Sequence, residues 1–151
     1  MAYANAIERC YAIVEAATPT TEAPRRFQRV RGKASTASDT GGVAATSGAF
    51  RKVEIVPGAS RRGTAVNGHG PKQIVHDLTI VVLYPDTAEP SLLATVEGDL
   101  NLLRSVLEDF RNYAFETSSL QNVRVGSNAR VRRDGTLQLQ IAATATYVGA
   151  N

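Results

Sequence analysis

The side chains best suited to catalysis are two histidines. His69 lies within a glycine-rich stretch, and His76 comes directly before Asp77 in a run with the pattern of a strand. Neighbouring side chains on a strand point to opposite faces of the sheet, so His76 and Asp77 are poorly placed to share a metal or to form a catalytic dyad. We therefore expect structural or solvent-exposed roles for both histidines.

Two short motifs imitate catalytic or phosphate-binding loops. Residues 58–63 miss the spacing of a nucleophile elbow by one residue, and no base is placed by the sequence to activate Ser60. Residues 68–72 precede a strand instead of joining a strand to a helix, so no helix N-terminus would meet a phosphate. We expect no enzymatic activity, no catalytic residue, no cofactor and no metal.

The basic residues gather in the middle third of the chain. Residues 25–72 contain ten basic and two acidic side chains, a net charge of +8, whereas the remainder has seven basic and twelve acidic ones. Such a segment can dock on acidic protein or follow a nucleic-acid backbone. Docking on acidic protein is the preferred interpretation, because only Phe27 and Phe50 could stack on bases and both are expected to face the core. The basic interface candidates are Arg25, Arg26, Arg29, Arg31, Lys33, Arg51, Lys52, Arg61, Arg62 and Lys72.

The acidic candidates lie on a long helix expected over residues 91–113. Its large apolar residues recur at steps of four and three, which places them on one helix face, and the charged residues fall mostly off that face. Carboxylates among arginines are typical of a solvated face, with a subunit interface as the alternative. The apolar set is Leu92, Val96, Leu100, Leu103, Leu107 and Phe110, and the carboxylates of the polar side are Glu97, Asp99, Glu108 and Asp109.

The other elements supply a sheet for this helix. The central strand is expected at residues 73–84, because its Ile-Val-Val-Leu run is apolar on both faces. In chain order we expect a helix over 2–17, strands at 27–31, 50–56 and 73–84, and then the long helix; Pro57-Gly58 closes the second of these strands. The chain is expected to close with a hairpin whose strands are 123–133 and 137–147. The hairpin turns at Asp134-Gly135, and its first strand has a possible bulge at Gly126. This order predicts one α+β domain over residues 1–151, with a mostly antiparallel sheet of four to five strands backed by two helices.

Two polar stretches, at about 32–48 and 57–72, have no hydrophobic spacing and are expected to be long mobile loops. Long loops within a small domain are usually functional or ordered by a partner, so they point to assembly. The single cysteine, Cys10, excludes an internal disulfide framework and suits a reducing compartment. No signal-peptide core or membrane span is found, so a soluble cytoplasmic protein is expected.

This order of elements resembles the tail terminator (tail completion or head-to-tail joining) proteins of long-tailed bacteriophages. The likeness covers almost the whole chain: a leading helix, a basic strand pair around Phe27–Arg31 and Phe50–Pro57, a mobile loop, the strand His76–Pro85, a long helix and a closing hairpin. The resemblance implies a ring, usually of six copies, that caps the finished tail tube, ends its polymerisation and joins the tail to the head.

The same resemblance implies the partners. They would be further copies of the chain, the tail tube protein and the head-neck connector protein, with DNA passing through the lumen without sequence recognition and with no membrane involved. The protein would belong to the virion, in its tail or neck, and assemble in the host cytoplasm. Another neck or tail-tube component, and a basic module that binds nucleic acid non-specifically, stay open as alternatives.

Overall fold

The computed structural model describes residues 2–21, 25–30, 50–62, 73–87, 90–113, 120–133 and 135–148. Within helices and strands, nothing is said of the side chains of residues 2–5, 62, 110 and 148. The loop expected at 32–48 and residues 63–72 of the second expected loop, including His69, lie outside the described residues.

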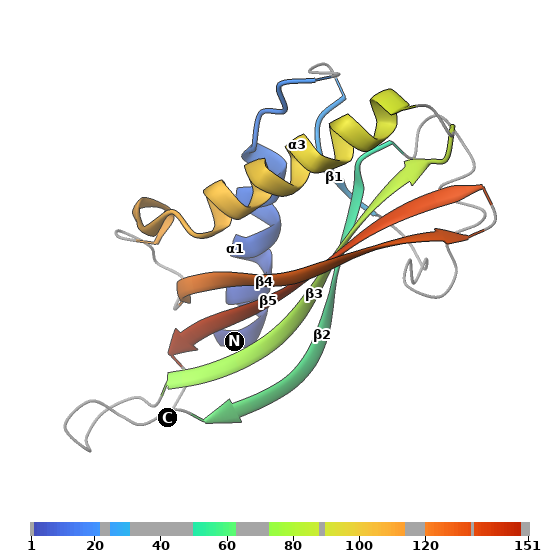
Figure 1. Cartoon of the computed structure of the whole chain (residues 1–151). Coiled ribbons are helices and arrows are strands. Elements are labelled where there is room, and N and C mark those ends of the chain that lie inside the picture. The colour runs from blue at the N-terminus through green and yellow to red at the C-terminus, as the bar shows by residue number, and fades with distance from the viewer. Residues whose placement is uncertain are drawn as a thin grey trace.

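A five-stranded sheet forms the centre of the fold (Figure 1). Its strands lie in the order β1-β2-β3-β5-β4, and all neighbours are antiparallel except β1 and β2, which are parallel. The strands are β1 (Gln28–Arg29), β2 (Lys52–Arg62), β3 (Gln73–Pro85), β4 (Leu120–Arg133) and β5 (Thr136–Val148). The expected α+β fold with a mostly antiparallel sheet is thereby confirmed, and β3 occupies the predicted central position.

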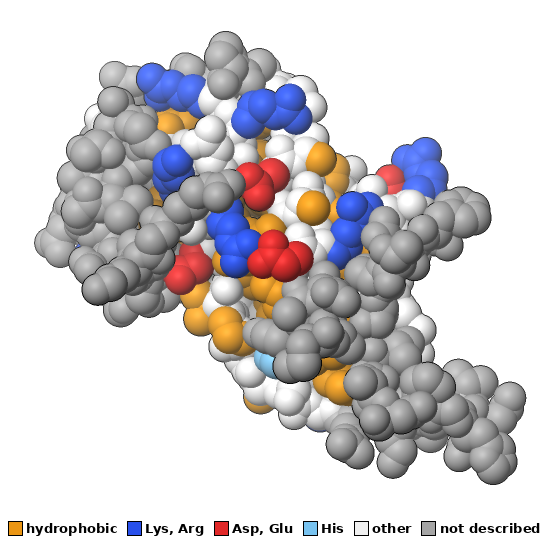
Figure 2. All heavy atoms as spheres, turned by 180° about the vertical axis from the view of Figure 1, so that it is seen from behind, with side chains coloured by type: hydrophobic (Ala, Val, Ile, Leu, Met, Phe, Trp, Pro, Cys, Tyr) orange, Lys and Arg blue, Asp and Glu red, His pale blue; other side chains and the backbone are white. Residues whose placement is uncertain are grey.

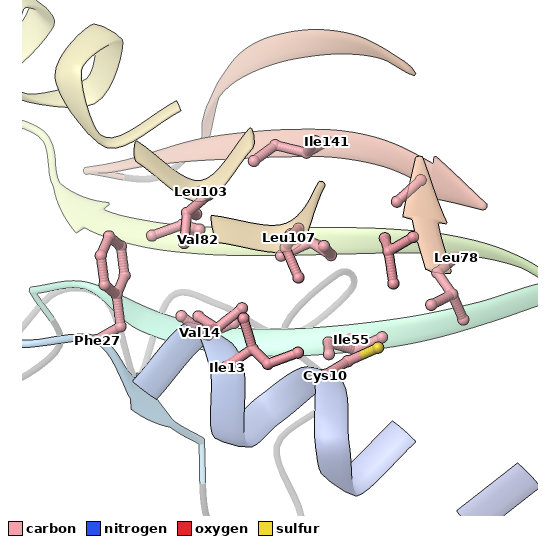
Figure 3. Packing of buried hydrophobic residues seen from close by; sticks show 14 of the residues in the cluster. Cys10, Ile13, Val14, Phe27, Ile55, Leu78, Val82, Leu103, Leu107 and Ile141 are labelled. Atoms are coloured by element: carbon pink, nitrogen blue, oxygen red, sulfur yellow. The ribbon is translucent and has the colours of Figure 1, made fainter. Parts of the chain in front are cut away.

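Two helices, α1 (Ala2–Ala16) and α3 (Pro90–Leu107), share one hydrophobic core with the sheet (Figure 3). In this core, Cys10 of α1 lies beside Ile55 of β2, and Leu103 of α3 lies beside Val82 of β3. Each large apolar side chain removed from water contributes about 1.5–3 kcal/mol before the entropy of ordering it is subtracted. The five described members of the predicted apolar face of α3 are all buried: Leu92, Val96, Leu100, Leu103 and Leu107.

The long helix is shorter than predicted. It ends at Leu107 instead of Tyr113, and a 3₁₀ turn, η3 (Phe110–Asn112), follows. The carboxylate of Asp109 accepts a hydrogen bond from the backbone N–H of Arg111 at 3.0 Å. Such a local side-chain bond competes with the helical hydrogen-bond pattern, which explains why the apolar periodicity outlasts the helix.

The central strand β3 is buried on both sides, as predicted. Ile80 and Val82 belong to the main core, whereas Val81 and Leu83 form a separate small cluster on the opposite face, packed against Val56. On β5 every second residue faces the core, and these residues are all buried: Leu137, Leu139, Ile141, Ala143, Ala145 and Tyr147.

Strand β2 continues beyond the predicted stop at Pro57-Gly58. Its register with β3 shifts between Pro57 and Ser60, and pairing then resumes to Arg62. Proline is tolerated there because β1 pairs with β2 only as far as Val53, so no described strand lies at the outer edge of β2 to receive an N–H at position 57. The expectation of a loop over 57–62 is therefore wrong.

The bulge predicted near Gly126 is confirmed by a register shift between Val125 and Asn128. It lies on the same cross-strand row as the irregularity in β2, because Pro57 pairs with Leu78, Leu78 with Ala143 and Ala143 with Val125. Bulges bend and twist a sheet, so this row is where both flanking strands change direction. The predicted hairpin is confirmed as well: β4 pairs with β5 up to the turn, where Gly135 has φ of 79°.

Candidate interaction surfaces

Arg51, a predicted interface residue, is fully buried, with 0% of its surface exposed. Its Nε donates to Oδ2 of Asp99 at 2.7 Å and its Nη2 donates to Oδ1 at 2.8 Å, which makes a two-pronged ion pair. The guanidinium also donates to the carbonyl of Arg25 at 2.9 Å and to that of Thr21 at 2.8 Å. Arg51 therefore joins β2 to α3 and to the connector after α1, and its assignment to an exposed interface is wrong.

The prediction that Asp99 lies on the solvated face of the helix is also wrong. Asp99 is buried, with 2% of its surface exposed. Besides Arg51, its Oδ2 accepts a hydrogen bond from the hydroxyl of Tyr84 at 2.6 Å. Burial, with the nearby charge of Asp99, raises the pKa of Tyr84 well above its ordinary value. The rings of Phe27 and Phe50 lie 5.5 and 5.1 Å from the Arg51 guanidinium, at cation–π range.

Four basic residues near α1 and the start of β2 form a group that we call the α1–β2 basic cluster: the exposed Arg25 and Arg26, and the partly buried Arg29 and Lys52. Arg26 donates to the carbonyl of Ala16 at the C-terminus of α1, where a cation is favourable. Arg29 pairs with Glu8 at 2.6 Å, and this hydrogen bond raises the pKa of its guanidinium. Figure 2 shows basic and acidic side chains interspersed on one face of the molecule, so this face is mixed in charge.

Tyr11 connects this cluster to the sheet. The guanidinium of Arg29 lies 3.9 Å from the centre of the Tyr11 ring, and the Tyr11 hydroxyl accepts a hydrogen bond from the backbone N–H of Ile55 at 2.8 Å. Burial is the main cause that raises the pKa of Tyr11. The hydroxyl thus satisfies an amide of β2 just beyond the end of β1.

The other described basic candidate, Arg61, lies at the opposite end of β2 from Lys52. It pairs with Val75 in register and contacts Asp77 at 3.1 Å, with both side chains largely exposed. The structure therefore separates Arg61 from the α1–β2 basic cluster. Arg31, Lys33, Lys72 and the side chain of Arg62 lie outside the described residues.

The three acidic candidates lie along α3 and just after it. Glu97 forms an ion pair with Arg130 of β4, and Oε2 of Glu108 accepts from the backbone N–H of Val125 at 3.0 Å. Asp109 pairs with Arg111 at 2.9 Å, a contact that lowers the pKa of the carboxylate. Glu97 and Glu108 therefore connect α3 to β4 and still remain exposed at the surface.

Strand β4 carries a basic row that the emphasis on residues 25–72 missed. Its fourteen residues include four exposed arginines, Arg124, Arg130, Arg132 and Arg133, and no acidic residue. Arg130 and Arg132 pair with Glu97 and Asp86, whereas no ion pair is found for Arg124 or Arg133 within the described part of the chain. These arginines are visible in the sequence as a local run. The charge count outside residues 25–72 combined them with twelve acidic residues, so the run was not noticed.

The candidates for reactive chemistry do not converge. The ring of His76 lies 6.4 Å from that of Tyr147, while Asp77 contacts Arg61 from the other face of β3, as the strand alternation predicted. Cys10 is buried in the core, and burial raises the pKa of its thiol to about 12. Within the described ranges no group of three or more His, Cys, Asp or Glu is placed to hold a metal, and neither described helix is long and apolar enough to cross a membrane.

Comparison with known proteins gives little beyond this geometry. No family model matches the sequence, and no curated protein matches it. Among solved structures, the chain is similar to one from the virion of a native gene transfer agent (GTA) particle, with 17% identity and a TM-score of 0.42, over 63% of this chain and 68% of the other.

Proposed function

We propose that this protein is a structural virion component without enzymatic activity, which forms a ring that caps a phage tail tube, ends tube polymerisation and joins the tail to the head. The proposal rests on the order of elements that carries the resemblance to tail terminators. The fold supports it with a leading helix, a central strand, a long helix and a closing hairpin in the expected sequence.

The charge distribution also suits a ring. A cyclic ring needs two different and complementary surfaces on each subunit. The α1–β2 basic cluster offers the exposed cations Arg25 and Arg26, whereas Glu97 on α3 and Glu108 just after it present exposed carboxylates. Several of these side chains already have partners within the chain, so ring contacts would add second partners to surface groups.

Capping is tested on tail tubes grown in vitro from the tube protein of the same particle. Gold-labelled protein added during growth should bind one end of each tube and shorten the tubes. Label distributed along the tube walls would instead identify a tube component, and unlabelled tubes of unchanged length would contradict the capping role.

Non-specific nucleic-acid binding remains the second candidate, and the arginine row of β4 is the observation that favours it. Binding through phosphates loses affinity steeply as salt rises. Titration of duplex DNA at several salt concentrations measures this directly, and affinity that does not change with salt would remove this candidate.

A further inference from the structure

The outer edge of β4 is an open strand edge in the described structure. β4 is the last strand of the sheet, and β5 is its only paired neighbour among the described strands. Two side chains approach the first half of β4: Glu108, just after α3, accepts from the N–H of Val125, and Arg104 of α3 donates to the carbonyl of Gly126 at 3.5 Å. Beyond the bulge, residues 127–133 are exposed apart from Val131, which is half-buried.

This open segment presents an alternating pattern of side chains. Arg130 and Arg132 pair in register with Leu139 and Leu137, so they lie on the helix-covered face of the sheet. Ala129 and Val131 lie on the opposite face, where their partners are Gln140 and Gln138. One side of the edge therefore carries Arg130 and Arg132, whereas the other carries Ala129 and Val131 and ends at the exposed Arg133, which pairs with Thr136.

The arginines retain capacity for a further partner. In the ion pairs with Glu97 and Asp86, the side chains of Arg130 and Arg132 are still 35% and 57% exposed. A guanidinium has five N–H donors, so one carboxylate does not exhaust it. An acidic residue on an added strand would lie directly across from these groups.

A second copy of this chain is a poor occupant of the edge. Pairing with the outer edge of β2 would meet Pro57, which has no N–H, and the exposed Arg61 of β2 would add positive charge to an interface that is already basic. Pairing two β4 strands would likewise set arginine against arginine, and like charges across a strand pair are destabilising. Charge complementarity instead requires an acidic partner.

We propose that residues 127–133 of β4 are a docking edge for an extended acidic segment of another protein. That segment would add a strand to the sheet, with Asp or Glu at alternate positions facing Arg130 and Arg132 and with apolar residues facing Ala129 and Val131. Main-chain hydrogen bonds would supply affinity. The arginines would set the register of the added strand and select a segment of negative charge. This proposal goes beyond the ring and stands whether or not the chain forms one.

The test uses the full chain and a fluorescent peptide that alternates glutamate and valine. Fluorescence anisotropy should show saturable binding, and hydrogen exchange should show new protection within 127–133. The same peptide with N-methylated backbone amides keeps its charge but cannot pair as a strand, so it should not bind. Equal binding of both peptides, or no binding of either, would overturn the proposal.

Two matched variants separate strand addition from general attraction to basic charge. Arg132→Gln should weaken peptide binding about fivefold, the scale of one cross-strand charge pair. Arg124→Gln removes the same charge from the same strand before the bulge and should change affinity less than about twofold. Equal losses in both variants, or displacement of the peptide by duplex DNA that protects the whole strand, would show polyanion binding and overturn the proposal.

Discussion

At the scale of single residues, the buried Arg51–Asp99 pair joins parts of the fold that are distant in sequence. A charged pair removed from water is tolerated only when its hydrogen-bonding groups find partners. Here the Asp99 carboxylate and two backbone carbonyls accept from the guanidinium, and the Tyr84 hydroxyl donates to the carboxylate. The pair therefore fixes the connector after α1 against β2 and α3.

Removing one member of this pair should be costly. Asp99→Ala leaves the Arg51 charge buried without its counter-ion and should lower the free energy of unfolding by about 3–5 kcal/mol. Urea denaturation measures the loss, with Asp77→Ala as the control, because its ion pair with Arg61 is 59% and 47% exposed on the two sides and should contribute little to stability. A stability of Asp99→Ala close to that of Asp77→Ala would show that the buried pair is not needed.

Because the Cys10 thiol is buried, the free energy of unfolding should fall at alkaline pH. Burial raises the pKa of its thiol from 9.0 to about 12, so the folded state holds the proton more tightly than the unfolded state. The contribution is complete below pH 9 and is lost as the pH rises toward 12, at about 1.4 kcal/mol per pH unit. Urea unfolding at pH 8, 9 and 10 should show this slope begin near pH 9, and Cys10→Ala should reduce it. Equal slopes in both proteins would contradict this assignment.

At the scale of elements, helix side chains protect both flanking strands. Tyr11 of α1 accepts the Ile55 amide of β2, and Glu108 after α3 accepts the Val125 amide of β4. Unpaired strand edges invite pairing with other chains, so these contacts limit where another strand can add.

The Tyr11 contact can be tested by removing one oxygen. Tyr11→Phe keeps the ring beneath Arg29 but leaves the Ile55 N–H without its acceptor, which should cost about 1–3 kcal/mol. Hydrogen exchange at Ile55 should accelerate. Glu8→Gln is the matched control, because it weakens the ion pair with Arg29 and leaves the Tyr11 hydroxyl in place. The interpretation fails if exchange at Ile55 is unchanged in Tyr11→Phe.

Hydrophobic periodicity predicted the elements well because it reports which face each segment buries. It predicted both helices, the central position of β3 and the closing hairpin. It could not reveal that Asp99 turns inward, because that depends on Arg51, which is distant in sequence. The continuation of β2 through Pro57-Gly58 was also hidden, since turn residues are tolerated at a bulge on a strand edge. Composition averaged over long segments concealed the arginines of β4.

At the scale of the whole molecule, the described structure separates its charged surfaces. The α1–β2 basic cluster lies by the end of α1, Arg61 lies at the far end of β2, and the arginines of β4 follow the opposite edge of the sheet. A subunit with several distinct charged surfaces can contact different neighbours at once, as a ring joined to a tube would require.

Reversal of Arg61 and Arg62 to Glu tests the far end of β2. The double variant should weaken ring formation or tube attachment and leave the monomer folded, because Arg61 is exposed and its pair with Asp77 is a surface contact. Arg111→Glu, an exposed reversal after α3, is the control for assembly. Full assembly by the double variant, with circular dichroism unchanged, would exclude this end of β2 from the interface.

The most direct test of the central claim is sedimentation velocity of the purified chain over a wide concentration range, with electron microscopy of the largest species. The account predicts a discrete oligomer that grows with concentration and appears as closed rings with a central hole, usually six-fold. A monomer at every concentration that also fails to form rings on tail-tube ends would contradict it.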